Sequence, residues 1–333
     1  MPNEVPTQEQ NTLYIDAISQ ALQDEMRADE TVVLMGQDIA DHGGAFKITR
    51  GFLDEFGDQR VRNTPIAESG TIGIATGAAM LGMRPVIEMQ FADFISCGFN
   101  QLVNVAAKMF WRTERAVPFV IRLPSGGGVG AGAFHSQNIE SWFIHTPGLK
   151  VVSPAFSADA YRLLRSAIRD PNPVLYFEHK FLYRREQSPL SEAPISDHIQ
   201  GEARVVRRGS SVTTISWGWM THKALEAAQT LSGEGIEVEV IDLPVLSPLD
   251  LQPIIESVRQ TQHVAIIHEA TITGGFGAEL AARLCDDNIW DLDAPVRRIA
   301  YPDSPAPFHK SLEADRIPSS ERICSELRQL ICD

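Results

Sequence analysis

The feature that most constrains this chain is a regular alternation of short apolar runs with amphipathic segments over nearly its whole length. Apolar residues recur at helical spacing in residues 12–28, 95–111 and 157–169. The predicted strands between them are residues 31–35, 85–91, 118–123, 149–153 and 173–178. Strands that alternate with helices usually run parallel, in a sheet that is covered on both faces. The chain is therefore predicted to have an α/β fold.

A polar, proline-bearing stretch at residues 184–201 interrupts this alternation and is predicted to be a domain linker. A second series of predicted strands follows, at residues 203–206, 212–217, 237–243, 264–268 and 296–300. A chain of 333 residues is too long for one comfortable hydrophobic core. We therefore expect two doubly wound α/β domains, at residues 1–190 and 202–333, of which the second is the smaller.

Composition argues against several classes of protein. The formal net charge is −14 and no dense run of Lys and Arg occurs, so nucleic-acid binding is not expected. No window approaches 18 uninterrupted apolar residues and no targeting segment is evident, so we expect no membrane association. The four cysteines, Cys97, Cys285, Cys324 and Cys332, lack metal-binding spacing. They fit a reduced compartment, and we expect a cytoplasmic protein of bacterial type.

Residues 64–82, TPIAESGTIGIATGAAMLG, place one carboxylate, Glu68, at the start of a predicted helix rich in small residues. Glycine inside a helix costs about 1 kcal/mol relative to alanine, so Gly70, Gly73 and Gly77 need a reason. Close approach of a ligand or of another backbone is a natural one. Glu68 then serves that ligand, or it is an ordinary helix-start acid stabilised by about 0.3–1 kcal/mol through the helix dipole.

A glycine loop, residues 123–137 (LPSGGGVGAGAFHSQ), follows a predicted strand and leads to His135. Gly128, Gly130 and Ala133 satisfy the GxGxxA pattern of dinucleotide-binding proteins. We reject that match because the loop follows several βα units, and the next strand lacks the acidic residue that binds a ribose hydroxyl. The loop is better explained as presenting His135 to a cleft at the carboxyl end of the sheet. A lone loop histidine is also often only solvated.

A third candidate lies in residues 88–100, EMQFADFISCGFN, where a strand ends in Gln90, Phe91 and Phe94 before a helix. Aromatic residues are usually part of a core. Their position at the carboxyl end of a strand also leaves room for a flat ring to stack on one of them. No GxSxG, HExxH or P-loop pattern occurs, so the sequence does not predict a hydrolase elbow, a zinc protease or a P-loop.

Together these stretches resemble the beta subunit of the thiamine-diphosphate-dependent first component of 2-oxo acid dehydrogenase complexes, in its pyruvate, branched-chain and acetoin versions. The matching text follows in order along nearly the whole chain: TPIAESG at Thr64, RPVIEMQFADF at Arg84, AFHSQ at Ala133, PGLKVVSP at Pro147, AIRDPNPV at Ala167, GGFGAEL at Gly274 and PDSPAPF at Pro302. The resemblance implies an N-terminal pyrimidine-binding domain and a C-terminal transketolase-like domain.

The resemblance also implies roles for single residues. The cofactor-activating glutamate of the family falls on Glu68 and its active-site histidine on His135. Its pyrimidine-contacting positions fall on Gln90 and Phe94, and related subunits carry Tyr or Phe at the second of these. Some members hold a structural potassium ion, whose positions here are Phe119, Ala167, Ile168, Asp170 and Asn172. A simple turn between a helix and a strand explains the same residues.

The GDG-to-NN motif that holds diphosphate and Mg²⁺ in this enzyme class is absent. The resemblance therefore implies an alpha subunit that supplies those ligands, in an assembly of two alpha and two beta chains with thiamine diphosphate at the interfaces. The implied reaction is oxidative decarboxylation of a 2-oxo acid, with acyl transfer to the lipoyl group of the second component. The alternatives are an acetoin dehydrogenase beta subunit, a nicotinamide-dependent oxidoreductase and a non-catalytic assembly subunit.

Overall fold

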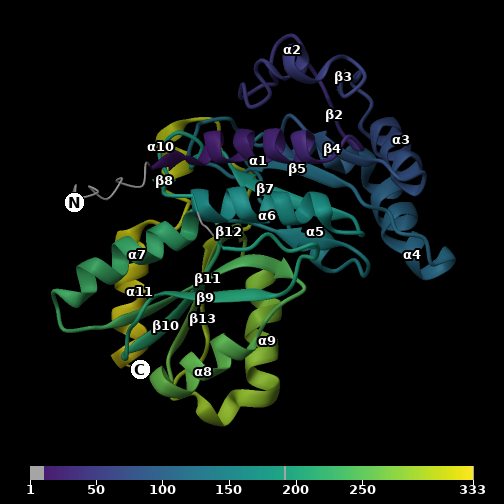
Figure 1. The fold of residues 1–333 in the computed structure, drawn as a ribbon. Coiled ribbons are helices and arrows are strands. Elements are labelled where there is room, and N and C mark those ends of the chain that lie inside the picture. The colour runs from purple at the N-terminus through teal and green to yellow at the C-terminus, as the bar shows by residue number, and fades with distance from the viewer. Residues whose placement is uncertain (1–10, 191–192, 333) are drawn as a thin grey trace, which may run out of the picture.

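The computed structural model describes residues 11–190 and 193–332, and within them eleven strands form one extended sheet (Figure 1). The N-terminal domain contains β1 (Thr12–Leu13), α1 (Tyr14–Ala28), β2 (Val32–Gly36), α2 (Phe52–Phe56), β3 (Val61–Asn63), α3 (Glu68–Met80), β4 (Arg84–Glu88), the 3₁₀ helix η1 (Ala92–Gly98), the π-helix η2 (Gln101–Ala106), α4 (Ala107–Thr113), β5 (Val120–Ser125), α5 (Ser141–Ile144), β6 (Lys150–Val152), α6 (Ser157–Arg169), β7 (Val174–His179) and β8 (Gln187–Ser188). The C-terminal domain contains β9 (Glu202–Arg207), β10 (Val212–Ser216), α7 (Trp219–Ser232), β11 (Val238–Ser247), α8 (Gln252–Thr261), β12 (Val264–Thr271), α9 (Phe276–Asn288), the 3₁₀ helix η3 (Ile289–Asp291), β13 (Arg297–Tyr301), α10 (Lys310–Ala314) and α11 (Ser320–Cys332).

The N-terminal domain is built on a parallel sheet in the order β3-β2-β4-β5-β7-β6. Successive residues of a strand point to opposite faces, and both faces here carry apolar side chains. Val120 of β5 packs into a core beneath α1 and α6, whereas its neighbour Ile121 packs into a second core with Ile72 of α3. The predicted parallel α/β sheet with helices on both faces is therefore confirmed.

The two domains share this sheet through β11. Val238 of β11 pairs in parallel with Val212 of β10, and Val245 pairs antiparallel with Val152 of β6. The sequence predicted a strand that ends at residue 243, before Pro244. The strand continues because the Pro244 carbonyl accepts a hydrogen bond from the Ser153 N–H at 2.9 Å, although proline has no N–H to donate.

Local structure departs from the predictions in several places, among them the end of β4, which lies at Glu88 and not at residue 91. The predicted helix over residues 95–111 changes its hydrogen-bond pattern from 3₁₀ (η1) to π (η2) to α (α4). Gly98, at the end of η1, packs so closely on α3 that a Cβ there would collide with Ile72. The helices α10 and α11 were not predicted, and α11 packs on α7 through Leu327. Part of the predicted linker, β8, pairs with β1, while residues 191–192 of that linker lie outside the described residues. No described helix is long and apolar enough to cross a membrane.

Candidate active site

Glu68 is the first residue of α3, and its side chain is partly buried beside the carboxyl end of β2. Gln37 directly follows that strand, and its Nε2 donates a hydrogen bond to Oε1 of Glu68 at 3.3 Å. The backbone carbonyl of Glu68 also lies against Gly98 at the end of η1. Glu68 is thus fixed at the edge of the sheet where open α/β folds bind ligands.

The face of α3 that continues from Glu68 is bare within the described part of the chain. A Cβ added at Gly77 would meet no described atom within 4 Å, and one at Gly70 would meet only Ala67, at 3.8 Å. The apolar side chains of Ile66 and Ile74 are 83% and 64% exposed. A Cβ at Gly73 would lie 3.8 Å from the Gln101 side chain of η2, but at Gly70 and Gly77 no other described element approaches closely. The face around Gly70 and Gly77 is therefore available to a ligand or a second chain.

Three rings form an aromatic wall beside η1, namely Phe91, Phe94 and His135. The His135 ring lies 4.6 Å from the Phe91 ring and 5.5 Å from the Phe94 ring, both edge to face. The structure thus brings together two residues predicted from distant motifs, Phe94 and His135, and with them Phe91, the other aromatic stacking candidate of the Phe94 motif. Gln90, which precedes Phe91, is partly buried. Edge-to-face packing of this kind fixes ring orientation.

The glycine loop carries His135 to this wall in a conformation that needs its glycines. Gly126, Gly128, Gly130 and Gly132 all have φ between 72° and 83°, in the left-handed region. Space is short as well: a Cβ at Gly126 would collide with the His179 ring, and one at Gly130 would lie 2.8 Å from the Lys310 side chain. The alternation of glycines therefore reflects backbone conformation and packing, and not a dinucleotide fingerprint.

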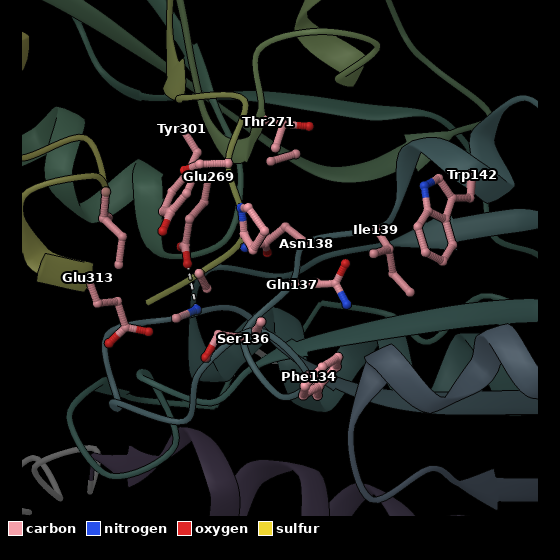
Figure 2. A pocket seen from close by; sticks show the side chains of 17 residues that line it. Phe134, Ser136, Gln137, Asn138, Ile139, Trp142, Glu269, Thr271, Tyr301 and Glu313 are labelled. Atoms are coloured by element: carbon pink, nitrogen blue, oxygen red, sulfur yellow. Dashed lines mark hydrogen bonds between the residues drawn. The ribbon is translucent and has the colours of Figure 1, made fainter. Parts of the chain in front are cut away.

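A cavity of about 480 Å³ separates the glycine loop from the C-terminal domain (Figure 2). Residues of both domains line it, among them Phe134, Ser136, Gln137, Glu269, Tyr301 and Glu313.

The residue before Glu269 in β12, His268, points to the opposite face of the sheet, as successive strand residues do. His268 stacks on Trp217 with ring centroids 5.5 Å apart, and burial lowers its pKa to about 4. Neither His268 nor Glu269 had a predicted role, and the two side chains lie on opposite faces of the sheet.

A buried charged group lies under the strand ends that carry the wall. The Arg122 guanidinium donates to Glu88 at 2.6 Å and to both carboxylate oxygens of Glu178, at 2.7 and 2.9 Å. Tyr183 donates to Glu178 as well, at 2.7 Å. Burial raises the pKa of Glu88 above its ordinary value despite this arginine. These bonds link β4, β5 and β7 where they approach the site.

Most of the residues predicted to hold potassium lie at the turn between α6 and β7. The carboxylate of Asp170 is already engaged, because Lys150 Nζ lies 2.5 Å from Oδ2 and the Asn172 N–H donates to Oδ1 at 2.9 Å. Arg84 donates to the Ile168 carbonyl at 2.8 Å. The usual helical donor to the Ala167 carbonyl would be residue 171, which is a proline without an N–H. A cation here would therefore rely mainly on backbone oxygens.

Comparison with known proteins supplies the family. Residues 11–186 match the model of the transketolase pyrimidine-binding domain, and residues 201–323 match that of the transketolase C-terminal domain. The 2-oxoisovalerate dehydrogenase subunit beta of Bacillus subtilis (strain 168) is 42% identical over 322 residues, which are 95% of this chain and 98% of that protein. The chain belongs to the family of 2-oxo acid dehydrogenase beta subunits. Dependence on thiamine diphosphate is a property that this family implies.

Other relatives of this beta subunit are named for pyruvate and not for 2-oxoisovalerate. The mitochondrial pyruvate dehydrogenase E1 component subunit beta of Caenorhabditis elegans is 38% identical, over 94% of this chain and 91% of that protein. The pyruvate dehydrogenase E1 component subunit beta of Rhizobium meliloti (strain 1021) is 39% identical, over 94% of this chain and 68% of that protein. The predicted family and the predicted class of enzyme are confirmed.

A solved structure, described as a split gene transketolase in an inactive beta4 tetramer, has the same fold as this beta subunit. The TM-score is 0.79, and the match covers 97% of this chain and 99% of that one. The sequence identity is 22%, so this likeness concerns the fold alone. The predicted pair of α/β domains, pyrimidine-binding and transketolase-like, is confirmed.

Proposed function

We propose that this beta subunit supplies the pyrimidine side of a thiamine diphosphate site and, with an alpha subunit, catalyses the oxidative decarboxylation of a 2-oxo acid. The observation that carries the proposal is Glu68, set at the start of a bare helix face and beside η1, the element that bears Phe94 of the aromatic wall. A carboxylate, a small-residue surface and a flat apolar wall are together what an aminopyrimidine ring requires.

These residues fit the cofactor by their chemistry. An added Cβ at Gly77 would occupy open space and one at Gly70 would meet only Ala67, so these glycines leave a surface that a ring can approach closely. Gln90 and Phe94 are the proposed contacts to the ring, through an amide and an aromatic face. When bound, thiamine diphosphate supplies a carbon nucleophile and an electron sink for the decarboxylation of the 2-oxo acid.

Glu68 is the proposed proton partner. Its Oε1 is oriented by the hydrogen bond from Gln37, which leaves Oε2 to face a ligand. A carboxyl group in this setting holds a proton at a ring nitrogen of the aminopyrimidine and so favours the tautomer that activates the cofactor. Gln37 then acts as a positioning residue, because it restricts the rotation of the Glu68 side chain.

His135 is the proposed group for charge near the substrate. Its edge-to-face contacts with Phe91 and Phe94 fix the ring at the end of the glycine loop. A histidine can donate or accept a proton near neutral pH. We propose that it stabilises charge during acyl transfer to the lipoyl group of the second component, a lipoyl acyltransferase.

The alpha subunit is the proposed source of the diphosphate and Mg²⁺ ligands. The exposed Ile66 and Ile74 beside Glu68 form an apolar surface that such a partner would cover. We propose an assembly of two alpha and two beta chains, located in the cytoplasm. Pyruvate and branched-chain 2-oxo acids are the proposed substrates, and an acetoin dehydrogenase beta subunit is the alternative.

Potassium is proposed as a structural ion held largely by backbone carbonyls, those of Phe119, Ala167, Ile168, Asp170 and Asn172. Because the Asp170 carboxylate is engaged by Lys150, the ion would add to the turn without replacing an ion pair. The melting temperature of the assembled enzyme should rise in potassium chloride relative to sodium chloride. Identical melting in the two salts would contradict the proposal.

The test is decarboxylation by the complex co-expressed with its alpha partner, measured as carbon dioxide released from pyruvate, 2-oxoisovalerate and 2-oxoglutarate. Glu68→Gln should lower the rate by about 10²–10⁴-fold, the range for loss of a general acid or base. Glu30→Gln, which alters an exposed acid, is the matched control. Near-normal release by the assembled Glu68 variant would refute the role and favour a non-catalytic assembly subunit.

For His135→Ala we expect a larger loss in the lipoyl-coupled reaction than in an assay with an artificial acceptor. Equal losses in the two assays would place His135 in decarboxylation itself. A nicotinamide titration of the same complex addresses the remaining alternative, and we expect no binding, because the glycine loop lacks the partner acid of a dinucleotide site.

A further inference from the structure

The glycine loop is held by carboxylates that do not belong to its own domain. The Gly127 N–H donates to Oε1 of Glu269 at 2.5 Å, a contact that is drawn in Figure 2, and the Gly130 N–H donates to Oε2 of Glu313 at 2.9 Å. Glu269 lies in β12 and Glu313 is in α10, both in the C-terminal domain. As whole residues, Glu269 and Glu313 are 7% and 1% exposed. The C-terminal domain thus reaches across the cavity and binds two loop amides.

A third carboxylate fixes the other end of the loop. Asp93 lies in η1, next to Phe94, and its Oδ1 accepts hydrogen bonds from the Gln137 N–H at 3.3 Å and from the Gln137 side chain at 2.9 Å. His135 lies two residues before this contact and five residues after Gly130. The loop therefore joins the C-terminal domain at one end to the helix of the aromatic wall at the other, with His135 near its fixed end.

Charge favours this arrangement. Glu269 also lies 2.7 Å from the His179 ring nitrogen Nε2, and the ammonium of Lys180, which is 5% exposed, interacts with the same carboxylates. Burial alone would raise the pKa of Glu269, but His179 and the Gly127 N–H hold it below its ordinary value. Glu269 is therefore ionised at neutral pH. An ionised acceptor makes a stronger bond to a backbone N–H than a neutral one.

The loop itself has little to order it. Its positive-φ glycines have large conformational freedom in the absence of contacts. Among the described residues, two backbone hydrogen bonds form within the loop, from Gly126 to the Gln137 carbonyl and from His135 to the Gly132 carbonyl, each at 3.3 Å. Contacts from outside the loop must therefore select its conformation, and these are packing on His179 and Lys310 together with the carboxylate bonds. Oε1 of Glu313 has no hydrogen-bond partner among the described residues, so the hydrogen bond that this side chain makes there is the one from Gly130 to Oε2.

We propose that Glu269 and Glu313 are positioning residues, which hold the glycine loop so that His135 stays against Phe91 and Phe94. Their effect on catalysis rests on the function proposed above for His135, but their effect on the loop does not. The C-terminal domain then contributes to the active site without touching substrate, because it sets the position of a residue in the other domain.

The first test measures the loop directly, by amide hydrogen exchange of the assembled complex. Glu313→Ala removes the acceptor for Gly130, and exchange in residues 126–132 should rise by at least about tenfold, with exchange in β2 and β4 unchanged. Glu313→Gln keeps a neutral carbonyl acceptor of the same reach and should restore most of the protection that Glu313→Ala loses. Asp315→Ala, at a neighbouring exposed acid, is the matched control. Unchanged loop exchange in Glu313→Ala would overturn the proposal.

The second test measures catalysis in the same variants. We expect Glu313→Ala to lower kcat in the lipoyl-coupled assay by about tenfold, with little change in the apparent affinity for thiamine diphosphate, and we expect Glu313→Gln to recover activity. If Glu313→Ala does not assemble, Glu313→Asp keeps the charge but shortens the reach, and it should show the same two changes. A loosened loop with normal kcat would overturn the positioning role.

The two proposals fail in different ways. If His135→Ala retains full activity in every assay, the proposed role of His135 is wrong, and loop exchange in Glu313→Ala still decides whether the carboxylate holds the loop. If His135→Ala is inactive but Glu313→Ala is normal in exchange and in kcat, the positioning proposal alone is wrong.

Discussion

Asp242 provides a sharp test of the electrostatics where the two domains meet. It lies in β11 and is fully buried. Thr221 donates to its Oδ1 at 2.7 Å, and Arg204 lies 3.4 Å from its Oδ2 while also bonding Asp159. Burial, and then the nearby charge of Asp159, raises the pKa of Asp242 from 3.8 to about 7, and the arginine offsets only part of this rise.

The direction of the effect on stability follows from linkage. Between pH 3.8 and about 7 the folded chain keeps a proton on Asp242 that the unfolded chain has lost. The free energy of unfolding must therefore fall as the pH rises through this range. Since one pKa unit corresponds to about 1.4 kcal/mol, the loss between pH 5 and pH 8 is about 2–3 kcal/mol.

Asp242→Asn should remove this loss, because the amide stays neutral at every pH and can still accept the bond from Thr221. Urea unfolding of wild type and variant at pH 5, 6, 7 and 8, followed by tryptophan fluorescence, measures the difference. That difference should move in favour of the variant by about 2–3 kcal/mol from pH 5 to pH 8. Asp58→Asn, at an exposed acid, should show no such trend. A difference that stays constant with pH would refute the reasoning.

Two other perturbations test the surroundings of the glycine loop. Burial lowers the pKa of Lys180 from 10.5 to about 8, so the folded protein loses the lysine charge at a lower pH than the unfolded chain does. The free energy of unfolding of the wild type should therefore rise by about 2–3 kcal/mol between pH 7.5 and pH 10. Lys180→Met should flatten this rise in urea unfolding, and an unchanged slope would contradict it. Gly126→Ala should lower the free energy of unfolding, measured by calorimetry, more than Gly57→Ala does. Both glycines have positive φ, and for Gly57→Ala we expect a loss of about 1 kcal/mol. Only Gly126 faces the His179 ring, which a Cβ there would meet. Equal costs would show that this contact is unimportant.

The candidate site was predicted in part because its motifs are local. Glu68, Gln90, Phe94 and His135 each stand in a short stretch that resembles the family, and the structure places Phe94 and His135 in one aromatic wall. Gln37 was missed, although its position directly after a strand was a usable signal, since ligands gather at the carboxyl ends of parallel strands. Phe91 was predicted only as one of two aromatic stacking candidates, because its contact with the His135 ring depends on packing that the sequence does not reveal.

The α/β alternation, the two domains and the family were predicted from periodicity, turn residues and motifs. Each of these signals is carried by residues that are close together in the sequence. How the domains join through β11, and which side chains hold the glycine loop, emerged only from the folded chain. Glu269 and Glu313 bind amides that lie 142 and 183 residues away in the chain. A hydrogen bond across such a separation leaves no periodic or local trace, and it becomes visible only when the folded sheet brings the two segments together.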